Sequence, residues 1–321
     1  MQGRKIAKII LGIGALICVG LFVFFYIISN KVKKELQAQV NSTISAFNQD
    51  GIAQITFDPF VCKGFFSYEC KSQRLELSTL WGQKITEVRD IRFGFKNITP
   101  KSIDETLHLS TPNFFGDIYE AEDLGGVEVN YEGSESIKDA KIGEILNDWK
   151  LSFDLLAASL KLQGKRRNQD PKWANQNIIQ IEMASMRNLG AKLLNAGQDL
   201  AYQELELQID SKGLENFAYT FLQKRGMEMS KQEYEEQVRM TAVQLKSTIQ
   251  EDPQLSSWKD ALTQAIDGAA ELLLGEAKSL KLKLRSKDGG YVNLKNFTQQ
   301  YSLDTLRSLS KVFNLSTEVK K

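Results

Sequence analysis

Alternation of apolar and polar residues, sustained from about residue 52 to residue 163, limits what this chain can fold into more than any other feature. Side chains of a strand point to opposite faces in turn, so a period of two buries one face and leaves the other in water. The apolar positions of the two clearest segments are Ile91, Phe93, Phe95, Val127, Val129 and Tyr131. Charged residues such as Asp90, Arg92 and Glu128 lie between them, which predicts an antiparallel sheet with one solvent-exposed face.

The second half of the chain mixes this period with helical spacing. Leu214, Phe217 and Phe221 recur at steps of three and four, as on one face of a helix. Ser230 and Glu233 form a capping-box pattern, which predicts the start of a second helix. Further elements are predicted as helices at about 256–275 and 303–313, strands near 205–209 and 280–284, and a hairpin turn at 288–290. The last helix is expected to close the chain.

An uncharged, mostly apolar run from Ile9 to Ile28 predicts a transmembrane helix. Twenty residues at a rise of about 1.5 Å reach about 30 Å, the thickness of the hydrocarbon core of a bilayer. The alternative is a cleaved signal peptide, which needs a shorter apolar stretch and a small-x-small site. This run is longer and lacks such a site, so it is expected to stay as an anchor.

A helical stripe follows the anchor, with Val32, Leu36, Val40 and Ile44 at steps of four and Phe47 three residues further on. Two interpretations remain open: the stripe packs on the following domain, or it forms a coiled-coil contact. The predicted organisation is an anchor at 1–30, a helical stalk at 31–50, a β-rich subdomain at 51–164 and a mixed α/β subdomain at 165–321, with a loop at about 164–171 between the last two. The fold class is therefore α+β: an N-terminal transmembrane helix and stalk, then an antiparallel, curved β-sheet ectodomain with helices packed on it in its second half.

Cysteine usage decides the expected orientation, because basic residues flank the apolar run almost equally on both sides. Beyond residue 30 the chain holds only Cys62 and Cys70, with seven residues between them. Two such cysteines are typical of a local disulfide across a hairpin, which favours an oxidising compartment. The alternative is two unrelated reduced thiols. The disulfide interpretation places the C-terminal domain in an oxidising compartment, with the chain crossing a membrane once.

Chemical motifs give a negative result. The single histidine, His108, is predicted on the polar side of a strand, and no paired His or CxxC pattern indicates a metal site. Phosphate-loop, dinucleotide, zinc-protease and serine-hydrolase patterns are missing from the sequence. We therefore expect no catalytic residues, no cofactor and no enzyme. A formal net charge of +1 also argues against a nucleic-acid partner.

One stretch resembles a known family. Gly64, Phe66, Ser67, Leu75 and Leu77 match an element that follows the anchor in the bacterial YdgA-like family of periplasmic proteins of unknown function. The order of anchor, short helix and amphipathic strands is also similar, and the strands near the C-terminus look like those of AsmA-like proteins. This chain is shorter than typical members and adds the cysteine pair. The resemblance implies an anchored, β-rich envelope protein that crosses the bacterial inner membrane once, with its C-terminal domain in the periplasm. The AsmA-like architecture implies a curved sheet with a groove for lipid.

Two hypotheses for function follow. In the first, the sheet is a non-enzymatic module that binds lipid or another apolar ligand, with Ile91, Phe93, Phe95, Val127, Val129 and Tyr131 as its candidate lining. In the second, the protein is a structural or adaptor protein that holds a protein partner at the inner membrane. The same six side chains have a second interpretation, in which they fill a closed core.

Overall fold

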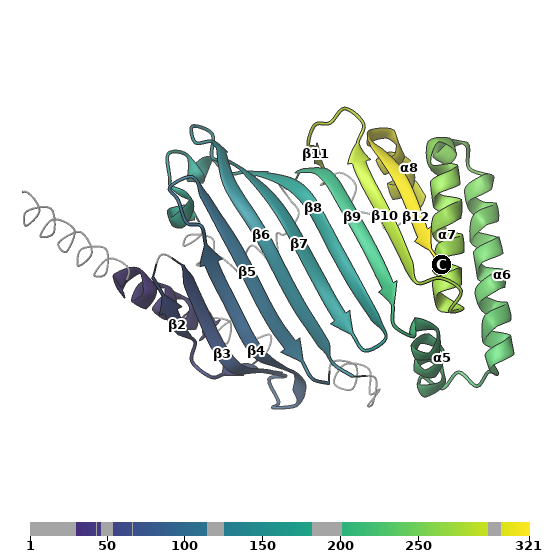
Figure 1. The fold of residues 1–321 in the computed structure, drawn as a ribbon, viewed down its shortest axis with the longest axis horizontal. Helices are drawn as coiled ribbons and strands as arrows, with labels where there is room; N and C mark the ends of the chain where they lie inside the picture. The colour runs from purple at the N-terminus through teal and green to yellow at the C-terminus, as the bar shows by residue number, and fades with distance from the viewer. Residues whose placement is uncertain are drawn as a thin grey trace, which may run out of the picture.

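The computed structural model describes residues 30–42, 44–45, 54–65, 67–113, 125–181, 201–294 and 303–321. Their dominant element is one 12-stranded sheet, which twists along its length (Figure 1). The strands follow the order β1-β3-β4-β5-β6-β7-β8-β9-β10-β12, with β2 beside β3 and β11 beside β9. Their bounds are β1 Gln54–Phe57, β2 Val61–Gly64, β3 Tyr68–Ser78, β4 Lys84–Lys96, β5 Ser102–Thr111, β6 Val127–Asp139, β7 Glu144–Leu155, β8 Ala158–Gln169, β9 Ala201–Ser211, β10 Ser279–Ser286, β11 Val292–Asn293 and β12 Phe313–Lys320.

Every pairing between these strands is antiparallel, and most helices come after β9. The helical elements are residues 30–42 and 44–45, η1 Pro171–Trp173, residues 178–181, α5 Leu214–Lys224, α6 Lys231–Gln250, η2 Pro253–Trp258, α7 Lys259–Leu273 and α8 Leu303–Val312. The predicted capping box is present, because Ser230 Oγ accepts from the Glu233 N–H while the Glu233 carboxylate accepts from the Ser230 N–H. The prediction of an α+β fold with a curved antiparallel sheet and helices in the second half is confirmed.

The predicted span Ile9–Ile28 lies outside the described residues. None of the helices that the structure does describe combines the length and the apolar content needed to cross a membrane. Within the predicted stalk, residues 30–42 and 44–45 are helical, and Leu36 and Val40 are buried against the sheet. This stripe therefore packs on the domain, as the first of the two interpretations expected.

The loop predicted at about 164–171 is wrong. These residues continue β8 to Gln169, and Lys165 pairs with Asp148 of β7 on one side and with Glu204 of β9 on the other. A run of charged residues forms strand here because hydrogen bonds from both neighbours satisfy its backbone. One sheet therefore runs through the predicted boundary between the two subdomains.

Two predictions near the C-terminus are also wrong. The turn at 288–290 does not make a hairpin, because β10 and β11 both pair with the same side of β9 and in the same direction. The turn is an excursion within one interrupted strand, held by a 2.6 Å hydrogen bond from Gln203 Nε2 to the Gly289 carbonyl. The last helix does not close the chain either, since β12 follows α8 and pairs with β10.

The apolar face of the sheet is covered at its two ends by different elements. At one end a cluster of buried residues joins the helix at 30–45 to β2–β5. Ile178 and Ile181 belong to the same cluster, together with Ile103 of β5 and Ile145 of β7. At the other end a smaller cluster joins Leu272 of α7 to Leu280 of β10. We call these the first and the second cluster. The strands between them position the candidate site.

Candidate functional site

The register of β5 to β9 aligns large apolar side chains on one face of the sheet. Leu107, Tyr131, Leu151, Leu162 and Leu207 occupy one row across the five strands. An adjacent row adds Val129, Phe153 and Leu160. We call these eight residues the central strip. All eight are half-buried, and none belongs to the first or the second cluster as the structure describes them.

The central strip is large enough for a hydrocarbon chain. Four strand spacings of about 4.8 Å separate β5 from β9, so the strip is about 19 Å wide. Half-burial of every member means that apolar surface remains accessible between two packed clusters. Contiguous apolar surface of this kind on a protein typically marks a site for an apolar ligand or partner.

The six predicted lining residues fall into two environments. Ile91 and Phe95 are buried in the first cluster, and Val127 is buried at the start of β6. Phe93 packs against that cluster, with its ring centroid 5.7 Å from that of Phe60. These four side chains fill core, as the second interpretation expected. The remaining two, Val129 and Tyr131, lie in the central strip.

A buried polar cluster lies on the same face as the central strip, a few residues further along β6, β7 and β8. Glu135, Asn147 and Arg166 face one another across β6, β7 and β8. Asn147 is only 3% exposed, and its Nδ2 donates to Glu135 Oε1. Arg166 Nη2 lies 3.5 Å from the same oxygen. This arrangement pairs the buried Glu135 carboxylate with both a guanidinium and an amide, as a buried charge requires.

Two polar atoms of this region lack a partner. Asn147 Oδ1 and Trp149 Nε1 are both buried and have no hydrogen-bond partner within the described part of the chain. The two residues are two positions apart on β7, so their side chains point to the same face. One atom accepts hydrogen bonds and the other donates them. Unsatisfied buried polar atoms are costly, and a group that both donates and accepts would satisfy them.

Glycines shape the sheet beside Trp149. In register, Trp149 lies between Gly133 of β6 and Gly164 of β8. A Cβ at Gly133 would lie 2.4 Å from the Tyr131 hydroxyl oxygen, so the tyrosine ring occupies the space above that glycine. Burial raises the pKa of the Tyr131 hydroxyl. The hydroxyl therefore stays protonated near neutral pH and adds a donor between the central strip and the polar cluster.

The opposite face of the sheet is charged and hollowed. Two hollows of about 600 and 420 Å³ open on it. Carboxylates and ammonium groups alternate in the larger one, including Asp104, Glu132, Lys150 and Lys165. His108 lies beside the smaller one, with its Nδ1 2.7 Å from Asn130 Oδ1, which confirms the predicted position on the polar side. Mixed charge gives neither hollow a preference for anions or cations, and no described group of three or more His, Cys, Asp or Glu is placed to hold a metal ion.

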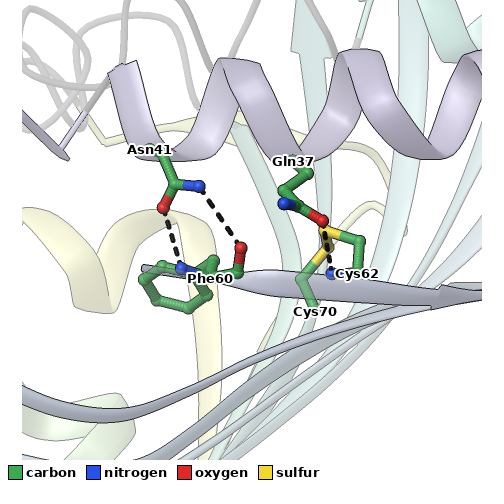
Figure 2. Close-up of a disulfide and its surroundings, with 5 residues drawn as sticks. All are labelled: Gln37, Asn41, Phe60, Cys62 and Cys70. Carbon is green, nitrogen blue, oxygen red and sulfur yellow. Dashed lines mark hydrogen bonds between the residues drawn. A yellow bond between two sulfur atoms is a disulfide. The ribbon is translucent and has the colours of Figure 1, made fainter. Parts of the chain in front are cut away.

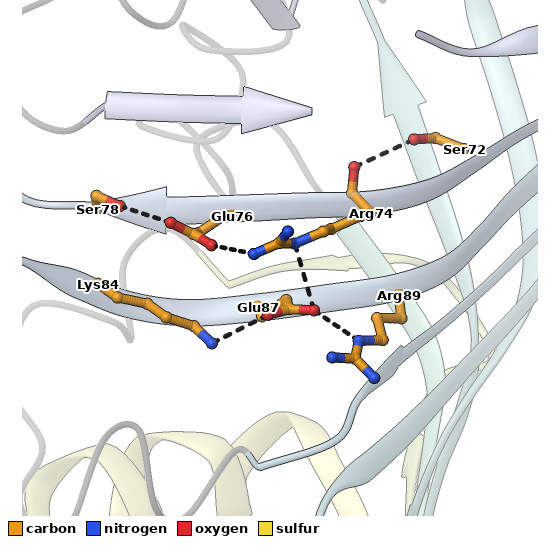
Figure 3. A network of polar contacts seen from close by, with 7 residues as sticks. All are labelled: Ser72, Arg74, Glu76, Ser78, Lys84, Glu87 and Arg89. Carbon is orange, nitrogen blue, oxygen red and sulfur yellow. Dashed lines mark hydrogen bonds and ion pairs between the residues drawn. The ribbon is translucent and has the colours of Figure 1, made fainter. Parts of the chain in front are cut away.

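A second polar network lies on the charged face of β3 and β4 (Figure 3). The Glu87 carboxylate is almost fully buried and lies 2.6 Å from Arg89 Nε, 3.0 Å from Lys84 Nζ and 3.4 Å from Arg74 Nε. Hydrogen bonds from Arg89 and Lys84 lower the pKa of Glu87 to about 2, from an ordinary value of 4.5. Arg74 also pairs with Glu76, so the network holds three cations and two carboxylates.

The predicted disulfide between Cys62 and Cys70 is present, and it closes the β2–β3 hairpin directly across its two strands. The helix at 30–45 lies over this hairpin (Figure 2). Gln37 Oε1 accepts from the Cys62 N–H at 3.1 Å, and Asn41 bonds both the N–H and the carbonyl of Phe60. Side chains of the helix thus satisfy backbone groups of the edge strand β2, while the disulfide fixes that strand to β3.

Sequence reasoning missed the polar cluster. The available signal was alternation along each strand. Residues two positions before and after Glu135, Asn147 and Arg166 face the apolar side, so these three polar side chains must face it too. Polar residues at inward positions of otherwise alternating strands mark buried polar groups. Comparison with known proteins gives no assignment: no protein-family model matches the chain, and no curated protein does.

Proposed function

We propose that this protein binds a lipid on the central strip, as the non-enzymatic domain of a protein anchored in the bacterial inner membrane and facing the periplasm. The observation that carries the proposal is the run of half-buried apolar residues between two packed clusters. The apolar run of residues 9–28 and the disulfide support the anchor and the oxidising compartment.

The polar cluster indicates which kind of lipid fits. The apolar chains of the lipid would lie on Leu151, Phe153 and Leu162. Its polar part would reach Asn147 and Trp149, which lie further along β7 on the same face. A hydroxyl or an amide both donates and accepts, so it matches the two unpartnered atoms. The lipid is therefore an amphiphile with a neutral hydrogen-bonding group next to its chains.

Lipid bound to the full chain tests the proposal. The protein is extracted from membranes in mild detergent, and bound lipid is counted by native mass spectrometry and by lipid extraction. Leu151→Asn places a polar side chain in the central strip, and we expect it to lower bound lipid several-fold. Leu146→Asn is the matched control, because Leu146 is a half-buried residue of the same strand on the opposite face.

Lipid around the predicted anchor copurifies with every variant, so the difference between variants is the measurement. Equal lipid content in wild type, Leu151→Asn and Leu146→Asn would refute a site on the central strip. An equal loss in both variants would also refute it, because the loss would then reflect damage to β7 as a whole.

A second candidate function is that of an adaptor. Helix α6 exposes Met240 and Val243, which lie three residues apart and so share one side of the helix. A photo-reactive residue at position 243 tests this candidate in intact cells. One cross-linked protein that recurs, and that is lost when the reactive residue is moved to the exposed position 244, about 100° around the helix, would support the adaptor function.

A further inference from the structure

Two turns of the sheet expose large apolar side chains to solvent. Trp81 and Leu80, in the turn between β3 and β4, are 91% and 55% exposed. Leu156, in the turn between β7 and β8, is 67% exposed. The β3–β4 turn is well formed, because Thr79 accepts hydrogen bonds from Gly82 and Gln83 and donates one to the Gln83 carbonyl. The indole of Trp81 is thus held out into solvent by an ordered turn.

The two turns lie on the same side of the sheet, at one end of its strands. Consecutive strands run antiparallel, so the turns that follow β3, β5 and β7 all fall at one end of the strands. We call the residues Leu80, Trp81 and Leu156 the Trp81 edge. The turn after β6 falls at the opposite end, where the large exposed residue is Ile142, at 43%.

Positive charge lies next to the Trp81 edge. Lys84 begins β4, and Arg74 and Arg89 follow further along the hairpin. Each of these cations is about half exposed, and together with Glu76 and Glu87 they leave the network with one net positive charge. Basic groups beside a membrane attract anionic headgroups, while tryptophan prefers the interface between headgroups and chains.

The helix at 30–45 shows that this edge is separate from the predicted anchor. Gln37 contacts Cys62 and Asn41 contacts Phe60, so the start of the helix points toward the Gly64 end of β2. That end of the hairpin is opposite to the β3–β4 turn. The chain therefore enters the domain at one end of the strands, and the exposed apolar side chains lie at the other.

We propose that the Trp81 edge inserts into the surface of an anionic lipid bilayer. The indole and the two leucine side chains would lie at the level of the headgroups, with Lys84, the cation nearest the turn, against the phosphates. This contact does not depend on whether the central strip holds a lipid, since none of its residues belongs to the strip.

Vesicle flotation tests the contact. The full chain is held in nanodiscs of neutral phosphatidylcholine and mixed with phosphatidylcholine vesicles that contain or lack phosphatidylglycerol. We expect wild type to float with the anionic vesicles and Trp81→Ser to lose at least about tenfold in apparent affinity, because burying a side chain of this size is worth more than one factor of ten. Thermal unfolding of Trp81→Ser should equal that of wild type, since the side chain has little to lose in the folded state.

Ile142→Ser is the matched control, an exposed apolar residue of a turn at the other end of the strands, and it should float as wild type does. Lys84→Gln should reduce the preference for phosphatidylglycerol several-fold. The proposal is overturned if wild type does not float, if Trp81→Ser floats as well as wild type, or if Ile142→Ser loses as much. A Trp81-dependent dimer in analytical ultracentrifugation without vesicles would also overturn it, because the edge would then bind a second copy of the chain.

Discussion

The β2–β4 end of the sheet and the central strip carry the same alternating pattern but differ in what lies over them. At the β2–β4 end, Phe95 and Ile91 are buried in the cluster that also holds Leu36 and Val40 of the helix at 30–45, and Phe60 lies beneath that helix (Figure 2). In the central strip, Leu151 and Phe153 stay half-buried and outside both clusters. Identical strand chemistry therefore serves two purposes, a closed core at one end and an accessible apolar surface in the middle.

This difference separates stability from binding. The β2–β4 end, which we call the covered end because the helix at 30–45 lies over it, combines apolar burial, helix-to-strand hydrogen bonds and a disulfide within a few residues of one another. The central strip instead borders on a buried polar cluster with two unpartnered atoms. A ligand-binding surface without its ligand leaves buried polar atoms without hydrogen bonds, and this lowers the stability of the free protein. The covered end can supply that stability.

The largest expected difference is between two phenylalanines. Phe95→Ala should lower the free energy of unfolding by about 3–5 kcal/mol, because it removes a buried ring and leaves a cavity. Phe153→Ala, in the central strip, should cost about 1–2 kcal/mol, because a half-exposed ring gains less from folding. Urea unfolding of the two delipidated full-chain variants measures both values. Equal costs would mean that the central strip is as closed as the first cluster and would remove the contrast between the two regions.

The disulfide should contribute the next largest effect. Replacing both Cys62 and Cys70 by Ala should lower stability by about 2–3 kcal/mol, because the cross-link restricts the unfolded hairpin. The loss should appear in protection of β2 and of the helix at 30–45, where the disulfide is placed, and not in β7 or β8. Hydrogen exchange of wild type and the double variant measures this distribution. Uniform loss of protection across the sheet would show that the covered end does not behave as a separate source of stability.

Much of the architecture followed from the sequence because it depends on neighbours in the chain. Strand alternation, the capping box at Ser230 and the hairpin disulfide are all set within about ten residues. The central strip was only partly predicted. Val129 and Tyr131 were assigned to the correct face, but Phe95 proved to be core, because the helix at 30–45 covers it. Which part of an apolar face is covered depends on contacts between distant segments, and periodicity does not carry that information.

The polar cluster was missed for a related reason. Arg166 stands in a run of three basic residues that is typical of a solvated turn. Arg166 nevertheless alternates regularly with Leu162 and Gly164 along β8, so it lies half-buried on the apolar face, opposite Asn147 of β7. Its face could therefore be counted along one strand. Its partners could not, because Glu135 and Asn147 come from β6 and β7, and only the pairing of the strands brings them beside Arg166.

The smallest effect should come from acid, and it should again be confined to the covered end. Glu87 has a folded pKa of about 2, below its ordinary value of 4.5, because Arg89 and Lys84 donate to its carboxylate. A lowered pKa gives stability that is complete above pH 4.5 and is lost as the pH falls toward 2. One pKa unit corresponds to about 1.4 kcal/mol, but the three cations are half exposed and screened, so we expect a loss of about 1–2 kcal/mol.

Glu87→Gln isolates this contribution. It keeps the shape of the side chain and removes its titration, so its stability should change less between pH 5 and pH 2.5 than that of wild type. Glu76→Gln is the control, because the Glu76 side chain is more exposed and, among the described residues, forms an ion pair with one cation, Arg74, where Glu87 has three. Unfolding is measured at both pH values, together with hydrogen exchange of β3 and β4. If Glu87→Gln keeps the full acid dependence, the three cations do not hold this carboxylate ionised. If the acid dependence disappears but exchange rises in β7 and β8 as much as in β3 and β4, the two regions are coupled, and the covered end does not carry its stability alone.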